Sequence, residues 1–340
     1  MPAPDIPVLR LDLSSKPPAW EEALRPVAPA GEELVGAFNQ TVERVTGSIG
    51  RKVLRQAASY VSRLLGRQYG AEIDAIGRAL NTDPDDILLA NLAYDLSQMG
   101  CSTVAFPGVN GPVHARNLDW EFPRRLLARN AIVVRAENGA RGPYKMVTWP
   151  GFFGALTGVA RDRFSVTVNY VCHDEESNWR GVVTRAAKGF WPVSWVVRRA
   201  FDEAKDFAAA VRLLKGEVLL APVLFMVVGT NDDERVVIER GCDTWEERRT
   251  PVERPLCLTN HYLTADFIDN NSDLGEMDTL ERFEALQYAA YRTNGSGPPA
   301  ALDLLNGEGI LRDDTQYQVA LEPRSGRITL RTADGRTCEA

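Results

Sequence analysis

The spacing of apolar residues divides the chain into two parts near residue 100. Over residues 34–64 apolar side chains recur every three or four positions, which predicts a long helix with one buried stripe. The members of this stripe are Leu34, Phe38, Val42, Val45, Ile49, Val53, Ala57, Val61 and Leu64. A second helical pattern covers residues 71–80. Segment 82–96 begins with Thr82 or Asp83 as a candidate N-cap and Pro84 near the first helical position, which predicts a helix start.

After residue 100 the apolar segments become short and typical of strands. Residues 101–106 and 112–120 flank a turn and predict a hairpin. Further strand patterns cover residues 129–149, 154–171, 222–230, 235–240, 316–323 and 327–332, and helical patterns return at 202–216 and 278–291. Runs of antiparallel strands with helices on separate stretches predict a layered α+β architecture that follows a mostly helical first hundred residues.

Composition and charge exclude several classes of protein. The chain has 340 residues, of which 44% are hydrophobic, so it can bury a substantial core. Its net charge of -7 argues against nucleic acid as a partner. The first residues contain no basic segment followed by an apolar run, and no stretch is long and apolar enough for a membrane span. Five widely spaced cysteines fit a reducing compartment, so we expect a cytoplasmic protein.

The sequence contains few residues or motifs that indicate a catalytic or metal-binding site. Three scattered histidines do not form a metal-binding pattern, and there is no HExxH, GxSxG, Walker or GxGxxG motif, so neither a metal nor another cofactor is expected. The remaining candidate nucleophile is Cys101, which is followed within a hairpin's reach by Arg116 and Asp119. A nearby arginine lowers the pKa of a thiol, and the thiolate is the nucleophilic form. Position alone favours the alternative that Cys101 is a small buried hydrophobe.

The spacing of Arg116 and Asp119 sets a geometric condition on this site. Residues three apart on a flat strand point to opposite faces. Both side chains can reach Cys101 only if the strand ends or bulges near Asn117 or Leu118. The structural alternatives remain open: Asp119 would then bind turn amides, and Arg116 would form a structural ion pair.

Residues 101–122, CSTVAFPGVNGPVHARNLDWEF, resemble the start of the catalytic chain in the acid ceramidase and N-acylethanolamine acid amidase (NAAA) family. This family is a branch of the N-terminal nucleophile (Ntn) hydrolases. Further similar segments follow in the family's order at residues 151–169, 202–229, 258–267 and 278–286, and residues 85–96 resemble its helical propeptide. The resemblance implies a four-layer αββα sandwich. It also implies a helical segment 1–100 like the family's α-subunit and a catalytic region 101–340 like its β-subunit, packed as one unit that stays associated after processing.

The family's catalytic residues carry over by position. Cys101 matches the nucleophile, which such enzymes expose by cutting the bond after Gly100. Arg116 and Asp119 match the family's GRNxD pattern, although this chain reads ARNLD. Asn260 matches the asparagine that helps to bind the oxyanion; its structural alternative is an ordinary loop residue.

Two further positions are less direct matches. Arg282 corresponds to a second active-site arginine, although the segment between it and Asn260 looks longer here. Tyr170 stands where family members have glutamate, so either Tyr170 acts differently or processing is altered. His114 and His261 are expected to be structural, because this mechanism does not need an imidazole.

The proposed nucleophile has a physical logic of its own. A free α-amino group has a pKa near ~8 and a thiol near ~8.5, so an N-terminal cysteine carries a nucleophile and a matched base. An amide nitrogen cannot act as that base, so the uncut chain should be inactive. The resemblance implies an amidase for N-acyl amides such as N-acylethanolamines or ceramide-like lipids. The alternatives are an acyltransferase or a penicillin or bile-salt amide hydrolase on the same fold, and an unprocessed, non-catalytic lipid-binding homologue.

Two features bear on the substrate and on membranes. Aromatic residues including Trp149 and Phe153 either line an acyl channel together with Tyr170 or belong to the core, and the sequence does not favour one reading. The helix over residues 34–67 carries an excess of basic residues that could contact an anionic membrane surface. These residues are Arg44, Arg51, Lys52, Arg55, Arg63 and Arg67, against Glu43. A solvated helix face is the favoured alternative.

Overall fold

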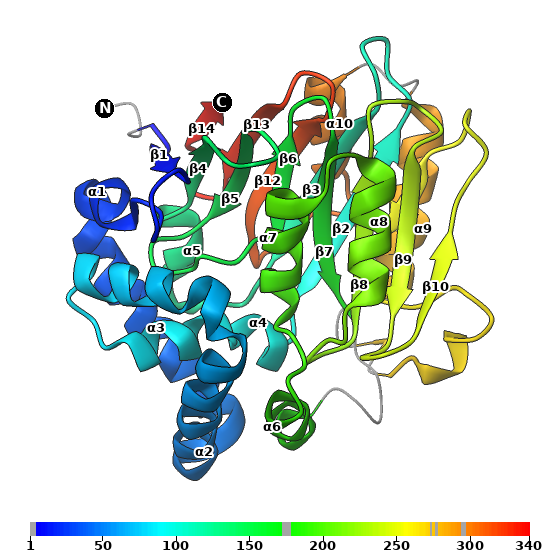
Figure 1. The fold of residues 1–340 in the computed structure, drawn as a ribbon. Helices are drawn as coiled ribbons and strands as arrows, with labels where there is room; N and C mark the ends of the chain where they lie inside the picture. Colours follow the sequence, from blue (N-terminus) through cyan, green and yellow to red (C-terminus); the bar gives the residue numbers. More distant parts are fainter. Residues whose placement is uncertain (1–4, 172–177, 273, 276–277, 294–296) are drawn as a thin grey trace.

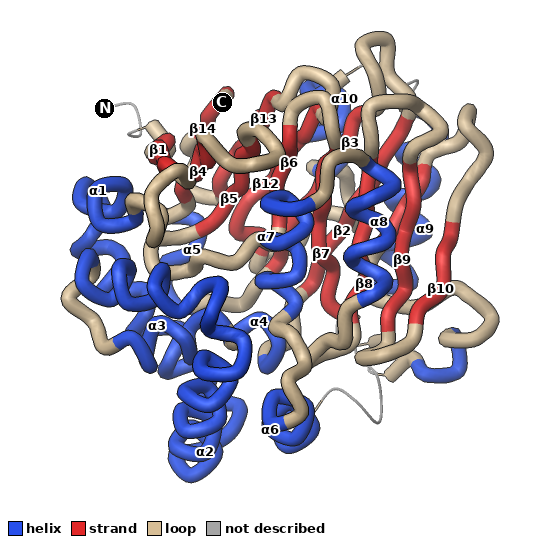
Figure 2. Tube along the Cα trace, viewed as in Figure 1, coloured by secondary structure: helices blue, strands red, loops and turns tan. Residues whose placement is uncertain are grey.

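Two β-sheets face each other in the computed structural model, and helices cover both outer faces (Figures 1 and 2). The structure describes residues 5–171, 178–272, 274–275, 278–293 and 297–340, and for residues 57–68 only the backbone is described. Helices α9 (Thr279–Arg292) and α10 (Pro298–Leu305) lie against the six-stranded sheet. Helices α7 (Val193–Glu203) and α8 (Phe207–Gly216) lie against the eight-stranded sheet. The predicted α+β class is confirmed.

The two sheets have different topologies. The larger sheet contains, in sheet order, β1 (Val8–Asp12), β4 (Ile132–Glu137), β5 (Tyr144–Thr148), β6 (Thr157–Ala160), β7 (Phe164–Tyr170), β8 (Val223–Val228), β9 (Arg235–Arg240) and β10 (Trp245–Arg248). The smaller sheet contains β11 (Leu256–Leu258), β2 (Gly100–Phe106), β3 (Val113–Asp119), β12 (Thr315–Glu322), β13 (Arg327–Thr332) and β14 (Thr337–Glu339). The predicted hairpin is β2 with β3, at the centre of the smaller sheet. Every residue of both strands is buried, because the larger sheet covers one face and helices cover the other.

The segment before residue 100 is helical, with one exception. Its main helices are α1 (Trp20–Leu24), α2 (Ala28–Ala79), α3 (Pro84–Asn91) and α4 (Ala93–Leu96). Asp83, one of the two predicted candidates, is the N-cap of α3, and its side chain accepts a hydrogen bond from the backbone N–H of Asp85. Strand β1 was not expected. It pairs in parallel with β4, so the N-terminal segment also completes the larger sheet.

The prediction of a single buried stripe along α2 is wrong at Val45, Ile49 and Val53, while the side chains of Ala57, Val61 and Leu64 lie outside the described residues. Leu34, Phe38 and Val42 are buried, whereas Val45 is 47% exposed and Ile49 is 78% exposed. The cause is a break inside α2 at Gly47, whose φ of 71° and ψ of 170° are not helical. A break of this kind rotates the following turns relative to the core, so the periodicity continues along the sequence while the buried face changes.

The basic residues of α2 are partly neutralised. Arg51 pairs with Glu43 at 3.2 Å, and Arg55 pairs with Asp83 at 2.9 Å and with Asp86 at 3.4 Å. The two pairs of Arg55 join α2 to the start of α3. The side chains of Arg63 and Arg67 lie outside the described residues. Membrane contact through residues 34–67 stays a prediction, with less free charge than the sequence suggested.

Shorter elements complete the chain. They are η1 (Arg25–Val27), η2 (Pro123–Arg125), α5 (Leu126–Arg129), α6 (Trp179–Ala187) and η3 (Ile268–Asn270). Within the described ranges, no helix has the length and apolar character needed to cross a membrane.

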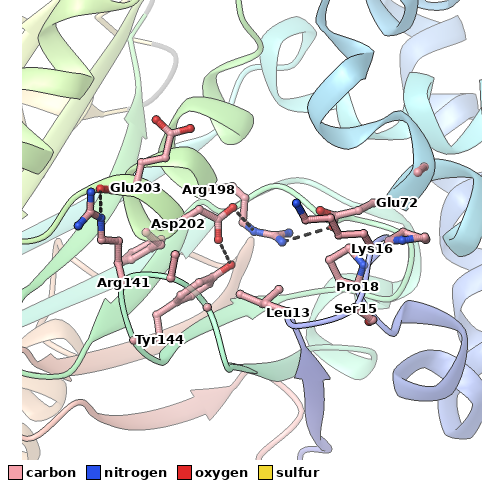
Figure 3. Close-up of a pocket in the computed structure, with 16 residues that line it drawn as sticks. Leu13, Ser15, Lys16, Pro18, Glu72, Arg141, Tyr144, Arg198, Asp202 and Glu203 are labelled. Atoms are coloured by element: carbon pink, nitrogen blue, oxygen red, sulfur yellow. Dashed lines mark hydrogen bonds and ion pairs between the residues drawn. The ribbon is translucent and has the colours of Figure 1, made fainter.

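The N-terminal segment shares a core with the rest of the chain. The ring of Phe38 on α2 packs against those of Trp120 and Phe122, with centroids 5.7 and 4.9 Å apart. A cavity of about 540 Å³ lies where α2 and the loop after β1 meet α7 (Figure 3). On its wall, Arg198 of α7 pairs with Glu72 of α2 at 3.3 Å. None of the site residues predicted from the sequence lines this cavity.

Candidate active site

Cys101 is the second residue of β2, and its thiol lies between the two sheets. It pairs with Leu118 of β3, while Arg116 pairs with Thr103. Because side chains alternate along a strand, Cys101 and Arg116 share one face of the hairpin. The Nη2 of Arg116 lies 3.0 Å from the Cys101 Sγ. The predicted contact between these two residues is therefore present.

Carbonyl and hydroxyl groups of the larger sheet hold Arg116 in place. Its Nη1 donates to the Leu156 carbonyl at 3.0 Å and to the Thr157 hydroxyl at 2.6 Å, and its Nη2 also donates to the Val168 carbonyl. Burial raises the pKa of the Cys101 thiol, and the Arg116 charge opposes that rise without cancelling it. The thiol of the uncut chain is therefore protonated at neutral pH and needs a base.

Asn260 lies directly beside the Gly100–Cys101 peptide, two residues after β11. Its Oδ1 accepts from the backbone N–H of Cys101 at 2.8 Å. Its Nδ2 donates to the carbonyls of Met99 at 3.1 Å and Tyr170 at 2.7 Å. The amide thus contacts the chain on both sides of the Gly100–Cys101 peptide bond, where the family resemblance predicts cleavage.

The less direct match, Arg282, also reaches this site. It lies on the first turn of α9, and its Nη1 donates to the Cys101 carbonyl at 2.7 Å and to the Ser102 hydroxyl at 2.9 Å. Its Nη2 donates to Asn260 Oδ1 at 2.8 Å. Arg282 therefore approaches Cys101 from the face opposite Arg116, because the Ser102 and Cys101 side chains alternate.

The structure does not place Asp119 and Arg116 on the same face. Strand β3 remains regular through Asn117 and Leu118, and the register shift lies in the neighbouring strand β12, between Thr315 and Tyr317. The strand end or bulge near Asn117 or Leu118 that would let both side chains reach Cys101 is therefore absent. Asp119 faces away from the Cys101 thiol and lies opposite Gly100. Residues three apart on a regular strand point to opposite faces, so Arg116 and Asp119 lie on different sides of β3.

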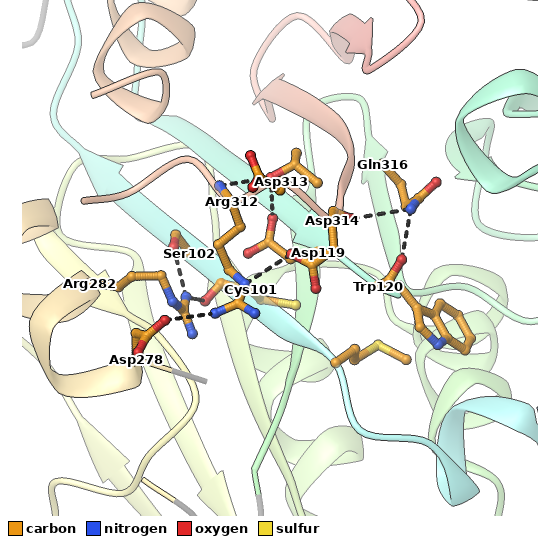
Figure 4. A network of polar contacts seen from close by, with 12 residues as sticks. Cys101, Ser102, Asp119, Trp120, Asp278, Arg282, Arg312, Asp313, Asp314 and Gln316 are labelled. Carbon is orange, nitrogen blue, oxygen red and sulfur yellow. Dashed lines mark hydrogen bonds and ion pairs between the residues drawn. The ribbon is translucent and has the colours of Figure 1, made fainter. Parts of the chain in front are cut away.

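Gly100 allows the close approach of Asp119. A Cβ atom at position 100 would lie 3.2 Å from the Asp119 Cβ and 3.3 Å from its Oδ2, which is tighter than ordinary contact. Burial raises the pKa of Asp119 to about 6, opposed by the charge of Arg282 and a hydrogen bond from Thr315. Figure 4 shows Asp119, Arg282 and Arg312 around the start of β2.

The residues predicted to bind substrate differ in position. Tyr170 ends β7, and its carbonyl joins the site through Asn260. Trp149 and Phe153 are buried in the core, and the indole Nε1 of Trp149 donates to the Leu127 carbonyl at 2.8 Å. The core reading fits both aromatic residues in this structure, and their contact with substrate stays a prediction.

The two described histidines are buried and hydrogen-bonded. His114 contacts the hydroxyls of Ser165 and Thr167 at 2.8 and 2.9 Å, and burial lowers its pKa to about 3. His261 contacts Thr279 at 2.9 Å, and burial lowers its pKa to about 4. Both imidazoles are therefore neutral at physiological pH.

Two residues at the site were missed by sequence reasoning. Thr315 donates to Asp119 Oδ1 at 2.6 Å, and Arg312 pairs with Asp314 at 2.9 Å close to Gly100. Both belong to a polar stretch almost two hundred residues after Asp119. Nothing in the local pattern marks them, because the contact depends on the pairing of β12 with β3.

Comparison with known proteins gives one consistent result. No protein-family model matches the chain. The N-acylethanolamine-hydrolyzing acid amidase of Cavia porcellus is 30% identical over 252 residues, which are 72% of this chain and 68% of that protein. The Mus musculus enzyme of the same name is 30% identical over 240 residues, 69% of this chain and 64% of that protein, so the match spans just under two thirds of its length.

More distant relatives agree. Acid ceramidase of Heterocephalus glaber is 23% identical over 250 residues, 65% of this chain and 60% of that protein. The solved structure of the Caenorhabditis elegans N-acylethanolamine-hydrolyzing acid amidase ortholog has a TM-score of 0.56 at 19% identity, and the match covers 66% of this chain and 93% of that chain. At that identity the likeness shows a shared fold. With the relatives above, it shows that this chain belongs to the NAAA and acid ceramidase family of Ntn hydrolases.

Proposed function

We propose that this protein is a cysteine amidase that cuts its own chain before Cys101 and then hydrolyses N-acyl amides, with a fatty acyl group as the preferred acyl part. The observation that carries the proposal is the arrangement around one peptide bond. The Cys101 thiol lies 3.0 Å from a fixed guanidinium, and the Cys101 nitrogen lies 2.8 Å from the Asn260 amide. A buried cysteine with a merely structural role needs neither contact.

The proposed self-cleavage takes place between two adjacent residues, Gly100 and Cys101. The Cys101 Sγ attacks the Gly100 carbonyl carbon, and the bond from that carbon to the Cys101 nitrogen breaks as the nitrogen takes up the thiol proton. Water then hydrolyses the thioester. The products are a carboxylate on Gly100, a free thiol and a new α-amino group on Cys101. This amino group supplies the base that the uncut chain lacks.

Cleavage also releases a hydrogen-bond donor for turnover. In the uncut chain the Asn260 Nδ2 is occupied by the carbonyls of Met99 and Tyr170. When the new end of the first chain moves away, one donor becomes available for the oxyanion formed as the Cys101 thiolate attacks a substrate amide. The amine leaves with a proton from the α-ammonium, and water hydrolyses the acyl-enzyme. A missing oxyanion donor typically costs on the order of 10²-fold in rate.

The substrate class rests on the relatives. The amidases named above act on N-acylethanolamines by their names, and the ceramidases on ceramide. We propose the same class of lipid amide for this chain. We also propose that residues 1–100 and 101–340 remain packed as one four-layer αββα unit after cleavage, since they share a sheet through β1 and a hydrophobic core.

The experiment is intact mass spectrometry of the purified chain from acidic to neutral pH, followed by an assay with N-acylethanolamines and ceramide. We expect fragments 1–100 and 101–340 and release of fatty acid, both lost in Cys101→Ala. Arg116→Gln should slow both on the order of 10²-fold, because the thiolate loses its cation.

Arg163→Gln is the matched control. Arg163 is also a buried arginine bound to carbonyls, those of Phe201 and Ala204, but it lies outside the site. If the chain stays whole at every pH, binds fatty amides and forms no product, the amidase proposal is wrong and the lipid-binding alternative is supported. Tyr170, which stands where family members have glutamate, would then be the first residue to test. Transfer of the acyl group to added amine in preference to water would support the acyltransferase.

A further inference from the structure

Asp119 has one carboxylate oxygen bound and one free. Its Oδ1 accepts from the Thr315 hydroxyl at 2.6 Å. Its Oδ2 is buried and has no hydrogen-bond partner among the residues that the structure describes. A buried carboxylate oxygen without a partner is costly, so its orientation needs a cause. The free oxygen faces Gly100, the residue whose carbonyl would leave Cys101 on cleavage.

The hydroxyl of Thr315 is committed to this one contact. It accepts from the backbone N–H of Arg312 at 3.2 Å, while the Thr315 N–H donates to the Arg312 carbonyl at 3.2 Å. The single hydroxyl proton is thereby directed to Asp119. Thr315 is buried, so water does not compete for this proton.

A bulge in β12 places Thr315 in this position. Thr315 pairs with Asp119 and Tyr317 pairs with Leu118, so Gln316 is an extra residue. The Gln316 side chain fixes the bulge by donating to the Trp120 carbonyl at 2.7 Å and accepting from the Ala128 N–H at 3.1 Å. Bulges beside active sites commonly re-aim one side chain. Without this bulge, Gln316 would stand opposite Asp119.

We infer that Thr315 is a positioning residue for the amidase: its hydroxyl holds Asp119 so that Oδ2 is aimed at the α-amino group that Cys101 gains on cleavage. The inference rests on the function proposed above and names a residue that acts through Asp119. Removal of the Gly100 carbonyl opens the space that Oδ2 faces, and the α-ammonium then supplies the missing hydrogen-bond partner. The other charged or titratable groups around Asp119 are Arg282 on α9, Arg312 and Asp314 before β12, and Cys101 on β2, whose thiol points to the opposite face of the strand.

The first test reads Asp119 directly, in the uncut full chain carrying Cys101→Ala. Asp119 is titrated by carbon NMR of labelled aspartate carboxyls, and its signal is identified by its loss in Asp119→Asn. Thr315→Val removes a hydrogen bond to the charged form, so the midpoint should rise by about one pH unit. Thr315→Ser keeps the hydroxyl and should restore the original midpoint. An unchanged midpoint in Thr315→Val, or a Ser variant that behaves like Val, would overturn the inference.

The second test uses the self-cleaved enzyme and the dependence of kcat/KM on pH for an N-acylethanolamine. Because the charged Asp119 carboxylate orients the ammonium, kcat/KM should fall at low pH as Asp119 becomes protonated. The apparent pKa of this fall should rise by about one pH unit in Thr315→Val and return to the wild-type value in Thr315→Ser. Thr148→Val is the matched control, because it removes another buried hydroxyl, bound to the Phe152 carbonyl at 2.7 Å. If Thr315→Val leaves this apparent pKa unchanged, Thr315 does not position Asp119. A wild-type chain that never cleaves would reject the proposed function, while the titration would still decide the link between Thr315 and Asp119.

Discussion

Single contacts decide how each candidate residue approaches the Gly100–Cys101 peptide. The residue types of Cys101, Arg116 and Asn260 and their order in the chain were predictable, because each belongs to a motif. The side of the peptide that each one approaches was not. Arg116 reaches the thiol from between the sheets, whereas Arg282 and Asp119 lie on the other face. The alternation of side chains along a strand predicts that Arg116 and Asp119 lie on opposite faces unless β3 is irregular. The structure shows that β3 is regular and that the irregularity lies in β12.

A second buried carboxyl, that of Asp95, is expected to make the stability of the protein depend on pH. Asp95 lies on α4, where its Oδ1 accepts from the Val193 N–H at 3.0 Å and its Oδ2 has no partner in the described part of the chain. Burial raises its pKa to about 7. The folded state therefore holds this proton more tightly than the unfolded chain, and stability should fall as pH rises from about 4 to 7.

Asp95→Asn should remove that pH dependence. The amide keeps the acceptor for Val193 and carries no charge, so above pH 7 the variant should be more stable than the wild type by a few kcal/mol, at about 1.4 kcal/mol per unit of pKa difference. Urea unfolding at several pH values measures this. Asp303→Asn, at an exposed site, should retain the wild-type slope. The same slope in Asp95→Asn would show that another group is responsible.

At the scale of elements, the break in α2 is the clearest departure from the sequence pattern. The apolar residues continue at helical spacing through Gly47, so periodicity alone cannot detect it. The conformation of Gly47, with φ of 71° and ψ of 170°, is open to glycine and almost closed to other residues. The break interrupts the buried face: Val45 and Ile49 are exposed, and α2 is buried in the core again at Leu54, Tyr69 and Ile73.

Gly47→Ala should lower the free energy of unfolding by about 1–3 kcal/mol, because alanine must either adopt this conformation or straighten the helix. Gly36→Ala is the matched control. Both positions have open space where a Cβ would lie, but Gly36 is in a regular turn of α2, so its substitution should stabilise by about 0.5–1 kcal/mol. Urea unfolding of both variants gives the comparison. Equal effects would mean that the break imposes no strain.

At the scale of the molecule, residues 1–100 are part of the fold and not an appendage. They supply an edge strand of the larger sheet, and Glu72 is buried against Arg198 and accepts from the Trp20 indole N–H. Deleting one partner of a buried ion pair leaves the other charge uncompensated. None of these contacts involves the Gly100–Cys101 peptide, so we expect them to persist if that bond is cut.

The cut protein should therefore elute as a single species with the mass of the whole chain, measured by size exclusion with light scattering. Glu72→Ala should lower the stability of the cut protein by about 3–5 kcal/mol, so that its fragments separate at a lower urea concentration. Arg10→Ala, which removes a largely exposed partner of Glu137, should change little. Fragments of the unmutated protein that separate in dilute buffer would contradict the shared-core account.

The local sequence pattern determined which segments of this protein form helices and which form strands. Periodicity and capping predicted the helices before residue 100 and the hairpin that begins at Cys101, and similarity of motifs indicated Cys101, Arg116 and Asn260. These signals are carried by residues close together in the chain. Tertiary structure decided the addition of β1 to the larger sheet, the two faces of the Gly100–Cys101 peptide and the contact between Thr315 and Asp119. Each of these depends on register between strands distant in sequence, which no local window contains.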